Sequence, residues 1–268
     1  MKFHTQNQLR NEDKSSGSID FEYVYPRLGL RGAAMQVVDM FIETVNEYIA
    51  TTKLASNADL DAMYSTYADG QESFFKINGE EMEGEDLYVG DFFSSLSEVV
   101  IIIHGSNSPL RNLKPGQGDA TYNHDFQDME EAGEIDVTVR FPENPGDIPM
   151  FLETFRKELR GFLAHEMQHA VQKLVYGIRL SEDVVNGLES HIADVFEIDA
   201  RVEEVIARLP DQTHEENEDG FLAELNQYLD QYLARNASQI KNLEEVKAGM
   251  VETHLLHYHR KLGKNNVM

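Results

Sequence analysis

The sequence of 268 residues contains no cysteine and no tryptophan. Without cysteine the chain forms no disulfide bond, and any metal site must take its ligands from histidine, aspartate and glutamate. The composition carries no mark of an oxidising compartment. We therefore expect a cytoplasmic protein, and a virion component encoded by a phage would satisfy the same facts.

Long apolar segments are also missing. No stretch approaches the roughly 20 apolar residues that a membrane-spanning helix needs. The polar residues 1–20, with a Ser-Ser-Gly-Ser tract, lack the apolar core of a secretory signal and indicate a polar arm. We therefore expect neither a membrane partner nor a signal peptide.

Basic residues are scarce: 23 Lys and Arg stand against 48 Asp and Glu, which gives a formal net charge of −25. This surplus repels nucleic-acid phosphates, so we expect no nucleic-acid partner. Solubility is the preferred explanation of the acidity. Attraction to a basic protein or peptide and mimicry of DNA are the alternatives.

The most informative motif is His165-Glu166-x-x-His169. Residues four apart lie on one face of a helix, so the two imidazoles can bind one metal ion, with Glu166 beside it as the general base for a metal-bound water. Apolar residues at three- and four-residue spacing predict a helix from Pro149 to near Gly177. The absence of cysteine favours an open, water-bearing zinc site over a closed structural one.

A catalytic zinc site needs a third protein ligand. Glu197 is the favoured candidate, because a helical pattern surrounds it and the small Ala193 and Ala200 share its face, which allows a second helix to approach closely. Glu189 is the alternative, and further candidates for a ligand or a supporting group are Asp194, His191 and Asp199. In the motif helix, Gly161 leaves space for a bulky group near His165.

The motif followed by Glu197-x-x-Ala200 resembles the gluzincin group of zinc metallopeptidases, in particular short members encoded by bacteria, phages and mobile elements. The thermolysin-like branch would place the ligand at Glu189, but its surrounding Asn-Glu-x-x-Ser-Asp pattern is absent. The resemblance covers the chain from the motif helix to the Glu197 helix. It implies an endopeptidase-like hydrolase in which His165, His169 and Glu197 bind Zn²⁺, Glu166 is the catalytic base, and the substrate is a protein or peptide.

The resemblance also implies a zincin-like α+β fold, with a small mixed sheet packed on the motif helix and further C-terminal helices. The apolar run Val99–Ile103 predicts a buried strand, and the alternating Ile135–Phe141 predicts either the edge strand on which zincins hold substrate or an ordinary core strand. Helices are predicted near 33–53, 221–235 and 238–261, a surface hairpin or loop at 78–91, and an irregular polar passage at 105–134. A break near Pro210 predicts a catalytic domain, residues 1–210, and a helical subdomain, residues 211–268.

Several features leave alternatives open. A developing oxyanion could be stabilised by Tyr176, His254, His257 or Tyr258, although a histidine-rich helix end at the surface is the favoured interpretation of the last three. The alternative function is a non-catalytic structural or interaction protein that retains the zinc-binding scaffold. The sequence determines neither the oligomeric state nor the cleavage specificity.

Overall fold

The computed structural model describes residues 30–52, 60–67, 74–77, 80–83, 99–107, 113–123, 133–174, 195–238, 240 and 242–263. Within these residues the fold is α+β. The strands are β1 (Asp61–Tyr67), β2 (Phe74–Ile77), β3 (Glu80–Glu83), β4 (Val99–Ser106), β5 (Gln117–Asn123) and β6 (Gly133–Arg140). The α-helices are α2 (Leu30–Thr52), α3 (Ile148–Leu174), α5 (Val195–Ala207), α6 (Glu218–Asn236) and α7 (Leu243–Lys261), and a 3₁₀ turn, η2 (Pro145–Asp147), precedes α3.

The main sheet has four strands in the order β1-β4-β6-β5. The central strands β4 and β6 are parallel, while β1 and β5 run antiparallel to their neighbours at the two edges. Strands β2 and β3 form a separate antiparallel hairpin. The hairpin confirms the prediction for residues 80–83, and the rest of the predicted loop lies outside the described residues.

Of the two interpretations of Ile135–Phe141, the ordinary core strand is confirmed and the edge strand is wrong. Residues Ile135–Phe141 lie mainly in β6, which pairs with β4 on one side and β5 on the other, so β6 is an interior strand. The edge strand is β5, within the passage for which irregular structure was predicted. Gln117–Asn123 lacks apolar alternation because one side of β5 faces solvent, and the other carries the small Gly118 and Ala120 beneath the motif helix.

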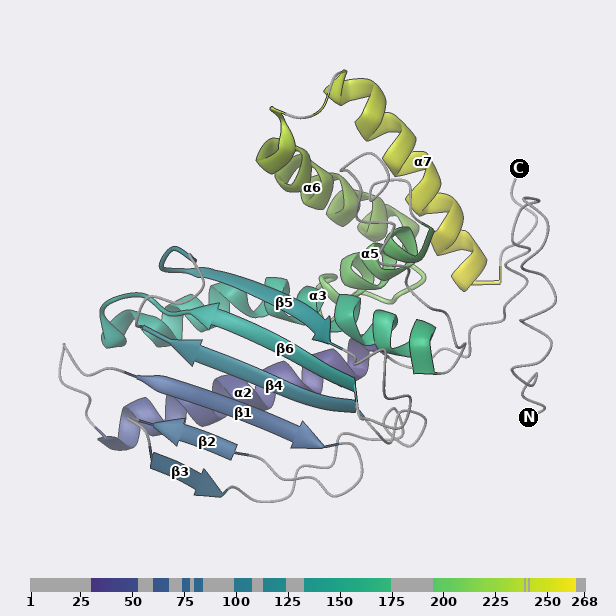
Figure 1. Ribbon diagram of the computed structural model, residues 1–268. Helices are drawn as coiled ribbons and strands as arrows, with labels where there is room; N and C mark the ends of the chain where they lie inside the picture. The colour runs from purple at the N-terminus through teal and green to yellow at the C-terminus, as the bar shows by residue number, and fades with distance from the viewer. Residues whose placement is uncertain are drawn as a thin grey trace.

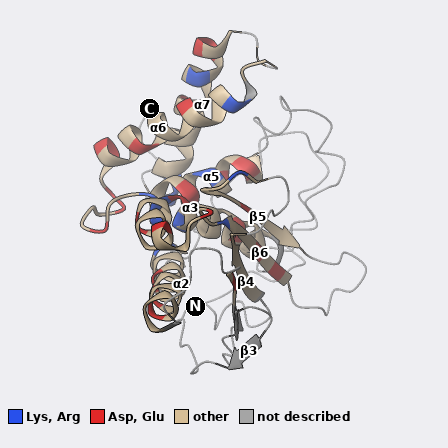
Figure 2. Ribbon diagram, turned by 90° about the vertical axis from the view of Figure 1, so that its left-hand side faces the viewer, with Lys and Arg blue, Asp and Glu red and all other residues tan. Residues whose placement is uncertain are grey.

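Helices α2 and α3 cover one face of the sheet (Figures 1 and 2). Their apolar sides and the inward side chains of the central strands form the first core, in which Phe41, Ile103, Val137 and Leu163 are fully buried. The helix predicted near 33–53 is confirmed as α2, and the buried strand at Val99–Ile103 is confirmed as β4. The helix predicted from Pro149 is α3, and its predicted end near Gly177 lies outside the described residues.

Helices α5, α6 and α7 pack together as a second unit (Figure 1). Its core includes Val205 of α5, Phe221 and Leu229 of α6, and Tyr258 of α7. Because Ala207 belongs to the first core, α5 contacts both. The division at residue 210 therefore stays a prediction, and the second core already begins within α5. None of the described helices combines the length and apolar character needed to cross a bilayer.

Candidate metal centre

The motif helix brings the two predicted histidines together. His165 and His169 lie one turn apart near the C-terminal end of α3, and their Nε2 atoms are 3.1 Å from each other. The rings are nearly perpendicular, at an angle of 76°. Both Nε2 atoms therefore face a common point, as the four-residue spacing on a helix requires.

Glu197 of α5 supplies the third group at this point. Its Oε2 lies 3.6 Å from His165 Nε2, and its Oε1 lies 3.4 Å from His169 Nε2. One ligand atom from each residue can be chosen so that all lie within 4.8 Å of one another, an arrangement that could hold a metal ion. The alternative ligands Glu189, His191 and Asp194 lie outside the described residues.

Each imidazole also has a hydrogen-bond partner at its Nδ1 atom, on the side of the ring away from the shared Nε2 position. Glu204 Oε2 lies 3.1 Å from His165 Nδ1, and Gln172 Oε1 lies 3.0 Å from His169 Nδ1. Because an ionised carboxylate only accepts hydrogen bonds, the Nδ1 atom of His165 carries a hydrogen, and Nε2 is the nitrogen that would release its proton to bind a metal. Gln172 donates its Nε2 to the carbonyl of Phe196, which orients its oxygen toward His169.

The electrostatics of the cluster favour a cation. Burial disfavours the charged imidazolium of His165, but hydrogen bonds with Glu197 and Glu204 and the nearby charge of Glu166 outweigh it and raise the pKa of His165 to about 10. Burial likewise opposes ionisation of Glu197, yet its contacts with His165 and His169 lower its pKa well below the usual range. The same oxygens that attract a proton would attract a metal ion at this position.

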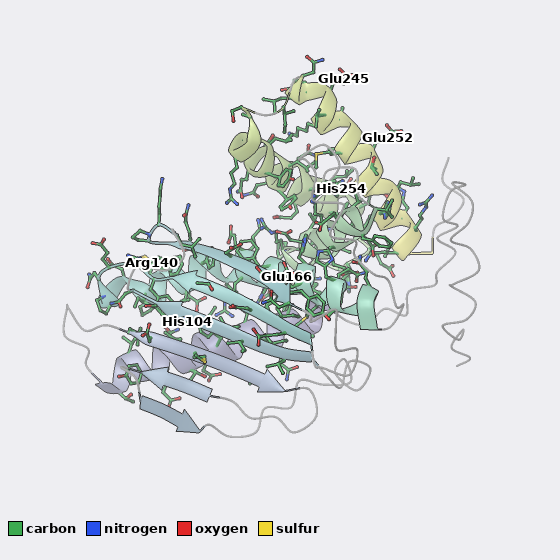
Figure 3. The ribbon with its side chains drawn as sticks, in the orientation of Figure 1. His104, Arg140, Glu166, Glu245, Glu252 and His254 are labelled. Atoms are coloured by element: carbon green, nitrogen blue, oxygen red, sulfur yellow. The ribbon has the colours of Figure 1, made fainter. Side chains whose placement is uncertain are left out.

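Glu166 lies on the side of α3 that faces the sheet edge (Figure 3). Its Oε2 accepts a hydrogen bond from the backbone N–H of Tyr122 in β5, at 2.8 Å. The carboxylate next to the metal cluster is thus oriented by the edge strand. In an antiparallel strand the backbone N–H and C=O groups of successive residues point alternately toward the partner strand and away from it. The backbone groups of Gly118 and Ala120 therefore point outward from the sheet edge, as those of Tyr122 do.

A close approach of α5 to α3 makes this geometry possible. A Cβ atom at Gly161 would lie 2.6 Å from Arg208 Nε and 3.1 Å from Glu204 Cγ. Arg208 in turn donates to Glu204 at 2.7 Å. The predicted bulky group near Gly161 is therefore the Arg208 side chain. Glu204 was missed at the sequence level, although its seven-residue spacing from Glu197 places both on one face of α5.

The three described candidates for oxyanion stabilisation are buried in the helical unit, so their interpretation as a surface cluster is wrong. His254 and Tyr258 are fully buried and His257 nearly so. His254 Nδ1 contacts the carbonyl of Met250, and the Tyr258 hydroxyl donates to that of Glu215. Tyr176 lies outside the described residues.

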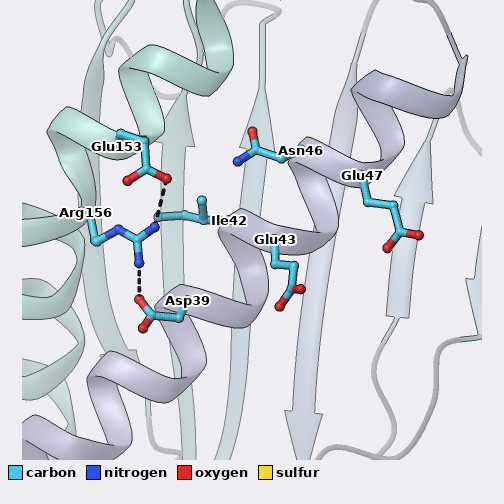
Figure 4. Close-up of a pocket in the computed structure, with 7 residues that line it drawn as sticks. All are labelled: Asp39, Ile42, Glu43, Asn46, Glu47, Glu153 and Arg156. Atoms are coloured by element: carbon cyan, nitrogen blue, oxygen red, sulfur yellow. Dashed lines mark hydrogen bonds and ion pairs between the residues drawn. The ribbon is translucent and has the colours of Figure 1, made fainter.

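Asp199, a lesser candidate, accepts a hydrogen bond from Gln168 of α3 at 2.6 Å and contacts Lys261 of α7 at 3.2 Å. It thus joins α5 to two other helices behind the metal cluster. A pocket between α2 and α3 contains none of the metal-cluster residues. There Arg156 bridges Asp39 and Glu153 beside further acids of α2 (Figure 4).

Comparison with known proteins found no match to this chain among family models, curated proteins or solved structures.

Proposed function

We propose that this protein is a zinc-dependent endopeptidase with a zincin-like fold. The observation that carries the proposal is the spacing of the three ligand groups. Metal bonds of 2.0–2.1 Å in tetrahedral geometry separate neighbouring donor atoms by about 3.3 Å. The nearest contacts among these groups, 3.1, 3.4 and 3.6 Å, lie close to that value, and the two histidines approach different oxygens of the Glu197 carboxylate.

The donor set agrees with a catalytic zinc site. Two imidazoles and one carboxylate, with a hydrogen-bond acceptor behind each imidazole, match the ligands and supporting groups of open zinc sites. Zinc bound there would lower the pKa of a water ligand and polarise the carbonyl of a peptide bond. Glu166 would take the proton of that water and return it to the departing nitrogen.

The edge strand supports a peptide as the substrate. Among the described residues β5 is paired on one side only, and its outward backbone groups can hydrogen-bond an added extended segment. Tyr122 N–H is bonded to Glu166, so the proposed base lies beside β5, and a segment added to this strand would run past it. The likeness to gluzincins rests on the motif His165-Glu166-x-x-His169 and on Glu197-x-x-Ala200.

The test has two parts. Mass spectrometry of the purified protein should find one zinc ion per chain, which His165→Ala loses. Cleavage of casein should fall about 10²–10⁴-fold in Glu166→Gln, because proton transfer by a positioned base contributes about that much. Glu153→Gln, an exposed glutamate on the same helix, is the matched control and should cleave like the wild type.

Two results would decide against the proposal. Casein cleavage that survives Glu166→Gln would remove Glu166 from the reaction. Stoichiometric zinc in a protein that cleaves neither casein nor a diverse peptide library would favour the alternative, a non-catalytic protein that retains the scaffold.

A further inference from the structure

One side of helix α3 is bounded by the edge strand. The Phe155 ring lies against Gly118, where an added Cβ would be 2.8 Å from it, and Glu166 is bonded to Tyr122. Between these contacts β5 advances four residues, about 13 Å, and α3 advances eleven, about 16 Å. Strand and helix therefore run alongside each other in the same direction.

The other side of α3 is bounded by the helical unit. Lys157 pairs with Glu224 of α6 at 2.6 Å, and Gly161 lies against the Arg208 side chain at the end of α5. An extended peptide added to β5 would therefore pass along the strip of α3 that lies between these two boundaries.

Glu158, Phe162 and His165 form this strip. They recur at four- and three-residue spacing, which places them on one face of the helix, and all three are half-buried. The strip thus begins at a carboxylate, continues over an aromatic ring and ends at the metal cluster.

Glu158 carries a charge that no described residue balances. Its Oε2 is enclosed and has no hydrogen-bond partner among the residues that the structure describes, so an incoming cation would meet the other oxygen of this half-buried carboxylate. The neighbouring cations are engaged elsewhere, since Lys157 pairs with Glu224 and Arg208 with Glu204. A partly desolvated carboxylate attracts a cation more strongly than a fully exposed one, because less water screens the pair.

The distance to the metal cluster sets the position that such a cation would occupy. Glu158 precedes His165 by seven residues, about 10 Å along the helix. An extended peptide rises about 3.3 Å per residue, so the matching side chain lies about three residues from the bond at the metal.

We propose that Glu158 binds a lysine or arginine side chain of the substrate, about three residues from the scissile bond. This inference rests on the proposed function and narrows its substrate class to basic peptides. The net charge of −25 agrees with it, because a strongly acidic surface draws basic peptides toward the site at low salt.

Binding can be measured without cleavage in zinc-loaded Glu166→Gln protein. Labelled peptides of one sequence would carry lysine or the neutral, similarly sized norleucine at each of four positions on either side of the central bond. Fluorescence anisotropy should show about tenfold tighter binding of the lysine peptide at the position about three residues away.

Variants at Glu158 then test whether this residue causes the preference for the lysine peptide. Adding Glu158→Gln should bring the affinity ratio close to one, and Glu158→Lys should reverse it. Glu153→Gln, the matched control, should keep the wild-type ratio. A ratio near one at every position, or a ratio that persists in Glu158→Gln, would overturn the inference. A Glu158-dependent ratio in a protein that never cleaves peptides would support this binding site while refuting the peptidase.

Discussion

Gly161 shows how a single small residue controls the metal cluster. The helix position itself gives no reason for glycine, because glycine destabilises a helix interior by about 0.5–1 kcal/mol relative to alanine. The reason lies in α5: Arg208 and Glu204 occupy the space that a side chain at Gly161 would need. Glu204 supports His165, so the packing and the metal cluster depend on each other.

We predict that Gly161→Ala destabilises the fold by about 1–3 kcal/mol, because the added Cβ forces α5 away from α3. Zinc affinity should fall as well, since Glu197 and Glu204 move with α5. Gly249→Ala in α7 is the control: an added Cβ there has no neighbour within 4 Å, so the variant should gain about 0.5–1 kcal/mol. Urea unfolding and a zinc titration against a chromophoric chelator measure both effects. Equal stability changes in the two variants would contradict this account.

At the scale of the elements, the end of α7 forms ion pairs with α5 at the place where α5 is hydrogen-bonded to the motif helix. Lys261 contacts Asp199 at 3.2 Å and Glu203 at 2.6 Å, and Asp199 accepts from Gln168 next to His169. Burial opposes the charge on Lys261, but the two carboxylates outweigh it and raise its pKa. Three helices thus meet in one buried ionic group directly behind the metal cluster.

We predict that Lys261→Met costs roughly 3 kcal/mol of stability, because it removes the cation from a buried ion pair. Zinc affinity should fall about tenfold at a temperature where the variant is still folded, since α5 also carries Glu197. Lys247→Met is the matched control on the same helix. Its partner Asp230 is exposed, so stability should change by less than about 1 kcal/mol and zinc affinity should not change. Unaltered zinc binding in folded Lys261→Met would show that this ionic group only supports the fold.

At the scale of the whole molecule, two cores meet at α5, and the second contains a buried histidine. Burial and the positive charges of Arg201 and His257 lower the pKa of His254 to about 4, against its contact with the Met250 carbonyl. An unfolded histidine titrates near 6.5. The neutral folded form therefore contributes its full stability above pH 6.5, and this contribution is lost as the pH falls from 6.5 toward 4.

We predict that His254 makes the protein acid-sensitive. Between pH 7.5 and pH 5 its titration should remove about 2 kcal/mol from the free energy of unfolding. His254→Gln cannot titrate, so its loss over the same pH range should be smaller by that amount. Urea unfolding of both proteins at matched ionic strength gives the comparison, and parallel pH profiles would show that His254 is not the cause.

Local sequence patterns determined much of the fold and the centre of the candidate site. The helices at α2, α3, α6 and α7 and the buried strand β4 follow from apolar spacing, because burying one side of a helix or a whole strand imposes that spacing. The pairing of His165 with His169 follows from helix geometry alone, since both lie on the same helix one turn apart.

The tertiary structure decided what depends on neighbours distant in sequence. β5 shows no strand pattern because its position at the sheet edge, beneath Phe155, requires small or polar residues in place of alternating apolar ones. The approach of Glu197 and Glu204 to the two imidazoles depends on how closely α5 packs on α3, a distance that no local periodicity encodes. Sequence alone thus determined the two histidines, and packing decided which carboxylates and which strand surround them.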